Sequence, residues 1–182
     1  MAGDTSLRIR DFLAIVRDAV LASAPPDGGP PYAWRQRFSY LQFYRRDSRV
    51  HFEVWPQKKT GRLEVGLHFE GPREFSYAWA ERLAERAGEI MAALGPDVEL
   101  EEWTPAWTRL HRTVPFEALT PELAEEAAAL LRRFMGALQP MVDEAWDEVF
   151  AASAPALEEA ARRREDGPRR RFRHRGRGGV PA

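Results

Sequence analysis

The residues best suited to chemistry lie in one hairpin-sized stretch, residues 50–70, which reads VHFEVWPQKKTGRLEVGLHFE. Its polar positions include His51, Glu53, Glu64 and His68, each set between apolar neighbours. Imidazole nitrogens and carboxylate oxygens bind zinc and iron, and the same groups can exchange protons as general acid and base. Because no diagnostic spacing such as HExxH accompanies them, the stretch suggests a metal or acid–base centre without identifying one.

The register of the strands decides which of these side chains meet. A two-residue turn at 47–48 pairs residues whose numbers sum to 95, and the next turn pairs residues whose numbers sum to 117. This register predicts Glu53 directly opposite Glu64, where like charges repel, and His51 diagonal to His68. Water, a neighbouring arginine, a shared proton or a cation would have to offset that repulsion.

Three interpretations of this polar side of the strands stay open. We favour a solvated sheet face, because antiparallel sheets commonly turn one face to water. The second is a surface for a peptide or nucleic-acid strand, on which aromatic rings stack beside arginines. The third is the metal or acid–base centre formed by the two histidines and two glutamates. The candidates for the binding surface are Tyr40, Tyr44, Arg46, Arg49, Trp55 and Arg62.

The opposite side of the same strands predicts a hydrophobic core. Alternation over residues 40–70 indicates a three-stranded antiparallel meander, and residues 97–114 fit a second hairpin. Residues 32–39 are ambiguous between a helical turn and the approach to a strand. Nine apolar residues share the core side: Leu41, Phe43, Val50, Phe52, Val54, Leu63, Val65, Leu67 and Phe69.

Charge complementarity is expected within the second hairpin. Glu99, Glu101 and Glu102 precede its turn, and Arg109 and Arg112 follow it. Opposite charges on paired strands attract, so we interpret these residues as ion pairs rather than as a catalytic group.

Helical spacing of apolar residues surrounds these strands. Pro140 is expected to break or kink the longest helical segment, since proline lacks the backbone donor. The expected segments are 6–23, 73–94, 120–140, 141–150 and a last one that begins near residue 153. The fold class predicted is α+β: a mostly antiparallel sheet of about five strands, amphipathic helices on one face and a helical C-terminal region.

Composition excludes several classes of protein. There is no cysteine among the 182 residues, which excludes thiol catalysis, disulfides and cysteine-ligated metal sites. The apolar run at 12–16 is too short for a signal peptide, and no run approaches the ~20 residues needed to span a bilayer. We therefore expect a cytoplasmic protein without membrane contact, and we expect no cofactor.

The C-terminal end is the strongest compositional signal for a partner. Residues 162–182 hold nine arginines against Glu165 and Asp166, a net charge of +7, whereas residues 1–161 carry −8. We interpret 1–161 as a single α+β domain and 162–182 as a disordered arginine- and glycine-rich tail. Such tails bind nucleic acid by charge and stacking, or fold back on an acidic body. The expected contacts are Arg169, Arg170, Arg171, Phe172, Arg173, Arg175 and Arg177.

Two functions follow as hypotheses. The leading one is a non-enzymatic binding or adaptor domain whose basic arm contacts nucleic acid or an acidic protein. The alternative is a metal-dependent hydrolase or acid–base enzyme that uses the His/Glu cluster of the meander.

Overall fold

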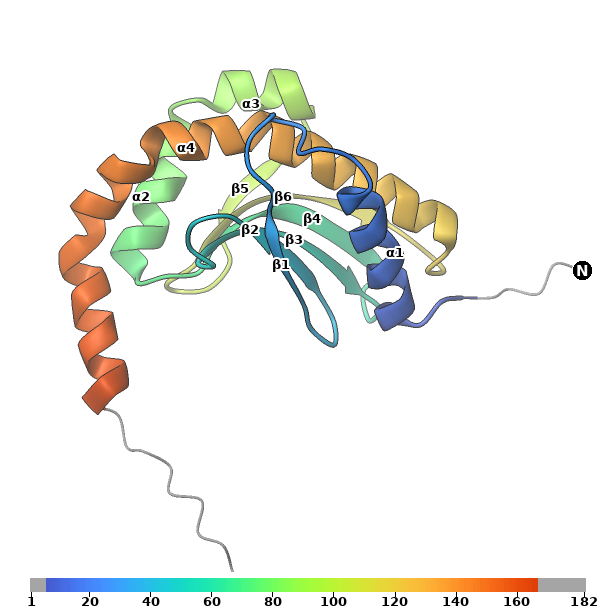
Figure 1. Ribbon diagram of the computed structural model, residues 1–182, viewed down its shortest axis with the longest axis horizontal. Helices are drawn as coiled ribbons and strands as arrows, with labels where there is room; N and C mark the ends of the chain where they lie inside the picture. The colour runs from blue at the N-terminus through green and yellow to red at the C-terminus, as the bar shows by residue number, and fades with distance from the viewer. Residues whose placement is uncertain (1–5, 167–182) are drawn as a thin grey trace, which may run out of the picture.

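The fold is α+β, as predicted, with one six-stranded antiparallel sheet. The structure is a computed structural model that describes residues 6–166. The helices gather on one face of the sheet (Figure 1). The strands are β1 Ala33–Gln36, β2 Leu41–Tyr44, β3 Val50–Gln57, β4 Arg62–Phe69, β5 Glu99–Glu102 and β6 Thr108–Pro115. The helices are α1 Ile9–Leu21, α2 Arg73–Ala84, α3 Ala87–Leu94 and α4 Pro121–Asp166.

The strand order, β1-β2-β3-β4-β6-β5, joins the predicted meander and the predicted second hairpin in one sheet. The junction is the long antiparallel pairing of β4 with β6, in which Gly66 lies opposite His111 and His68 lies opposite Arg109. The ambiguous segment before the meander forms β1, which adds a sixth strand at the edge beside β2. The sheet therefore brings residues from both halves of the chain onto one surface.

The predicted register is right between β2 and β3 and wrong between β3 and β4. Gln42 pairs with Glu53, as expected, but Glu53 pairs with Gly66, so the second pair of strands is shifted by two residues. The reason is the turn. Pro56 stays within β3, and the chain reverses over only four residues, 58–61, which end in Gly61 with the left-handed φ of 62°. Because the shift is even, each side chain keeps its face while its cross-strand neighbour changes.

The hydrophobic core lies between the helices and the sheet face that they cover. All nine residues predicted for that face are buried. Helix α1 contributes Phe12 and Leu13, and α2 contributes Trp79, whose ring stacks on Phe69 at 5.4 Å. The first third of α4 adds Phe134, which is fully buried. This packing fixes the orientation of β2, β3, β4 and β6, and hence which of their side chains point to the other face.

The helices differ from the prediction in two places. The expected helix over 73–94 is interrupted at Glu85 and Arg86, where Arg86 departs from helical dihedral angles. By contrast, α4 runs unbroken for 46 residues through Pro140 and Pro155, so the predicted separate helices are wrong. Buried residues flank Pro140 on both sides, and this packing outweighs the lost backbone hydrogen bond. Figure 1 shows α4 as one long curved helix.

The C-terminal boundary also changes. Residues 162–166, which we assigned to a disordered tail, form the end of α4. The predicted nucleic-acid contacts between Arg169 and Arg177 lie outside the described residues. Within residues 6–166, no helix is long and apolar enough to cross a membrane.

Candidate metal centre on the polar face

The helix-free side of the sheet, which we call the polar face, is buried rather than solvated. The solvated interpretation is therefore wrong for its central residues. Larger neighbours cover them: Arg35 donates hydrogen bonds to the Gln42 amide oxygen, and the Trp103 ring lies 5.3 Å from that of His68. The central residues and their exposed fractions are Gln42 2%, His51 0%, Glu53 3%, Glu64 1%, His68 0% and His111 4%. Buried polar groups in such numbers need partners, and their arrangement is specific.

The two histidines of the meander are direct neighbours. His51 pairs with His68 across β3 and β4, with ring centroids 5.5 Å apart, so the predicted diagonal arrangement is wrong. The predicted opposition of Glu53 and Glu64 is also wrong, since Glu64 lies opposite Trp55. The two-residue shift of the turn causes both differences.

Four side chains converge on one point of the polar face: His51, Glu53, His68 and Glu70, here called the quartet. Each offers a nitrogen or oxygen atom, and these four atoms all lie within 4.8 Å of one another. His51 Nε2 is 3.5 Å from Glu53 Oε2 and 3.8 Å from Glu70 Oε1, and His68 Nδ1 is 3.8 Å from the same Glu70 oxygen. Three of the four residues predicted for a metal are thus brought together.

Glu70 takes the place that we expected for Glu64. It follows β4 directly, two positions after His68, so the alternation of side chains puts it on the same face. We did not include Glu70 among the candidate ligands, although the strand alternation, continued one step beyond His68, places it on the same face. The Glu70 side chain is 21% exposed, which makes it the member of the quartet that solvent reaches most.

The ring nitrogen of His51 that points away from the quartet, Nδ1, forms a hydrogen bond with the backbone. His51 Nδ1 lies 2.8 Å from the Ser48 carbonyl oxygen, which can only accept, so Nδ1 carries the proton and Nε2 presents its lone pair to the quartet. The Gln42 amide donates to this Nε2 and to Glu53 Oε2, at 2.9 and 2.7 Å. These are hydrogen bonds that a cation at the quartet would replace.

His68 uses the opposite ring nitrogen for the contact that holds it. Its Nε2 lies 3.0 Å from Glu64 Oε1, and its Nδ1 is buried and makes no hydrogen bond within the described residues. Burial alone would lower the pKa of His68, but the carboxylates of Glu64, Glu70 and Glu53 raise it to about 9. The polar face therefore stabilises positive charge at this position.

Arg109 organises the neighbouring carboxylates. Its guanidinium contacts both oxygens of Glu64 at 3.0 and 2.8 Å and Glu101 Oε1 at 2.6 Å. The expected pairing of acidic β5 with basic β6 is thus confirmed for Glu101. Burial would raise the pKa of Glu64, but His68 and Arg109 hold it below its usual value. A second group, Glu99, Glu101 and His111, also brings possible ligand atoms together, but its Glu101 already accepts hydrogen bonds from Arg109.

The residues predicted for a stacking platform do not form one surface. Trp55 lies on the polar face against Trp103, with ring centroids 5.9 Å apart. Arg46 and Arg49 turn to the helical side instead, over the rings of Trp146 and Phe75. Of the remaining three, Tyr40 directly precedes β2, Tyr44 ends it and Arg62 begins β4.

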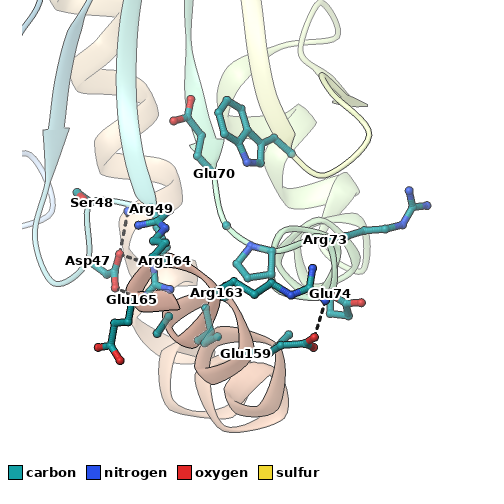
Figure 2. A pocket seen from close by; sticks show the side chains of 17 residues that line it. Asp47, Ser48, Arg49, Glu70, Arg73, Glu74, Glu159, Arg163, Arg164 and Glu165 are labelled. Carbon is teal, nitrogen blue, oxygen red and sulfur yellow. Dashed lines mark hydrogen bonds and ion pairs between the residues drawn. The ribbon is translucent and has the colours of Figure 1, made fainter. Parts of the chain in front are cut away.

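A pocket of about 820 Å³ adjoins the quartet. It lies between the last turns of α4 and the loops at one end of the sheet, and Glu70 belongs to its lining. Figure 2 shows Glu70 at the edge of this pocket away from α4, with Arg163 and Glu159 on the helix side. Glu70 is thus the member of the quartet that also lines the pocket.

Comparison with known proteins adds no assignment, since no family model, no curated protein and no solved structure matches the chain.

Proposed function

We propose that the quartet binds a divalent transition-metal ion of the zinc or iron class and that the protein is a metal-dependent hydrolase. The observation that carries the proposal is the convergence of two histidine nitrogens and two carboxylates in a buried site. The outer nitrogen of each histidine is bonded to an oxygen: a backbone carbonyl for His51 and a carboxylate for His68. Metal-binding histidines almost always have such outer partners.

The spacing of the ligand atoms supports the same assignment. Zinc binds nitrogen and oxygen at about 2.0–2.2 Å, so tetrahedral ligand atoms lie about 3.3–3.6 Å apart. The distances from His51 Nε2 to Glu53 and from His68 Nδ1 to Glu70 are 3.5 and 3.8 Å. These two pairs need to close by at most a few tenths of an ångström, and any pair in the quartet at the upper limit of 4.8 Å would need to close by about 1.2 Å.

The exposure of the ligands supports hydrolysis as the activity. Catalytic zinc sites commonly keep three protein ligands and one position for water, whose pKa the metal lowers. In this assignment the buried His51, Glu53 and His68 hold the ion. Glu70, the most exposed of the four and part of the pocket lining, is the ligand that an arriving water or substrate would replace.

The test combines metal analysis with a matched control. Wild-type protein loaded with zinc and dialysed should retain about one ion per chain, and Glu53→Gln should retain far less. Glu125→Gln makes the same chemical change at an exposed position of α4 and should behave as wild type. Retention of less than a stoichiometric amount by the wild type would end the proposal.

Hydrolysis needs its own assay. Zinc-loaded wild type and Glu125→Gln should cleave a chromogenic ester or phosphodiester, and Glu53→Gln should not. If the protein binds one zinc ion per chain but hydrolyses none of these substrates, the hydrolase proposal is wrong and the proposal of a metal-binding protein remains.

We also propose a second function, nucleic-acid binding by the basic C-terminal segment. The observation that favours it is the exposed side chains of Arg162, Arg163 and Arg164 at the end of α4, directly before the arginine-rich residues 167–182. If this holds, full-length protein should retard a labelled single strand at low salt and a 1–161 truncation should not. Equal retardation by both proteins, or none by either, would remove this function.

A further inference from the structure

We infer that Glu64 is the positioning residue of the proposed metal centre: it orients His68 so that Nδ1 binds the ion, while His51 binds through Nε2. This inference rests on the proposed function, and it adds which atoms coordinate and what holds them. It also assigns a role to the one predicted ligand that lies outside the quartet.

The contact between Glu64 and His68 decides which nitrogen is available. His68 is fully buried, and Nε2 lies 3.0 Å from Glu64 Oε1. Metal binding requires the neutral imidazole, so the ion must displace one proton of the imidazolium form that the surrounding carboxylates favour. The Glu64 carboxylate can only accept a hydrogen bond, so the proton that remains is the one on Nε2. The lone pair is then on Nδ1, the nitrogen that faces Glu70 and lacks a hydrogen bond within residues 6–166.

Glu64 is itself fixed and cannot turn into the quartet. Arg109 binds both of its oxygens, and Gln57 donates to Oε2 at 2.9 Å. The lone pairs that a metal would need are therefore occupied, and the side chain is 1% exposed. Glu53 and Glu70 have no arginine within ion-pair distance among the described residues, which separates ligand carboxylates from the positioning carboxylate.

Packing limits the rotation of the His68 ring. The Trp103 ring meets it nearly edge-on, with an interplanar angle of 66°, and the His51 ring lies on another side at 5.5 Å. A ring held between two aromatic neighbours and a carboxylate keeps Nδ1 directed at the same point. Preorganisation of this kind raises metal affinity, and loss of an outer partner typically weakens binding by about 10–100-fold.

The experiment compares zinc affinity in Glu64→Gln and Glu125→Gln by competition with a chromogenic chelator. Glutamine keeps the shape and an acceptor but removes the charge, so we expect about 10–100-fold weaker binding only at position 64. Circular dichroism of the zinc-free proteins checks that both variants fold. Unchanged affinity in a folded Glu64→Gln would overturn the inference.

A second measurement does not depend on any variant. NMR of the wild type, with isotopically labelled cadmium and nitrogen, should show metal–nitrogen coupling to Nδ1 of His68 and to Nε2 of His51. Coupling to Nε2 of His68, or none from His68, would overturn the inference and leave the metal site standing. Failure of the wild type to take up any metal would instead overturn both proposals.

Discussion

Gly66 occupies a crowded position on the polar face. It lies in β4 between Glu53 of β3 and His111 of β6. A Cβ atom at this position would lie 2.5 Å from His111 Cβ, 2.7 Å from the Leu110 carbonyl oxygen and 2.9 Å from His111 Cα. Non-bonded carbon atoms are best separated by about 3.5–4.0 Å. Gly66→Ala therefore requires a displacement of about 1 Å.

The displaced atoms decide the cost of this substitution. Two of the three are backbone atoms of β6, so a change of side-chain rotamer cannot relieve the clash and the β4–β6 pairing must shift. Overpacking of this kind costs about 1–3 kcal/mol of unfolding free energy. At about 2–4 °C per kcal/mol for a chain of this size, a loss of 2 kcal/mol lowers the melting temperature by about 4–8 °C.

The assay is thermal and urea unfolding followed by circular dichroism, with Gly88→Ala as the matched control. Gly88 lies in α3, where an added Cβ meets nothing within 4 Å, and alanine there should stabilise the helix by about 0.5–1 kcal/mol. The two substitutions should thus move the midpoint in opposite directions. A Gly66→Ala protein as stable as wild type would refute the close approach of β4 and β6.

Two further predictions concern charge and metal. Asp27 and Arg45 form a buried ion pair, so Asp27→Asn should cost about 3 kcal/mol at neutral pH, measured by urea unfolding. Burial would raise the pKa of Asp27, but the ion pair with Arg45 holds it below the ordinary value of 3.8. The stability that this ion pair contributes is therefore fully present above pH 3.8, and it is lost as the pH falls through the lower pKa of Asp27 in the folded protein. The difference between the two proteins should therefore narrow in acid, and a constant difference would contradict this assignment. Zinc at a hundred times its dissociation constant should stabilise wild type by about 2.7 kcal/mol, and a similar gain in Glu53→Gln would contradict binding at the quartet.

The sequence predicted the faces of the strands better than it predicted their partners. Side chains alternate with a period of two, so nine core residues and the polar residues opposite them could be assigned from the pattern alone. The partners of β4 depended on a turn in which Pro56 stays in the strand and Gly61 closes the reversal. An error of two residues there kept the faces of β3 and β4 correct and still predicted the wrong neighbours for Glu53 and His51.

The candidate site was only partly predictable for the same reason. His51, Glu53 and His68 could be named, because they lie close together in the sequence on one face of two adjacent strands. The role of Glu64 could not be named, because its partner Arg109 is 45 residues away and reaches it only through the pairing of β4 with β6.

The sequence by itself thus determined the fold class, the core side of the sheet and the histidines and glutamates that share the other side. These are local properties, set by the strand period and by helical spacing. Only the tertiary structure decided that the polar face is buried, that Glu70 completes the quartet and that Glu64 stands outside it. Each of these depends on contacts between distant segments, since Trp103 and Arg109 from the second hairpin lie against the meander. The alternation of side chains along a strand determines which face each residue lies on, but the pairing of strands distant in sequence determines which residues on that face contact one another.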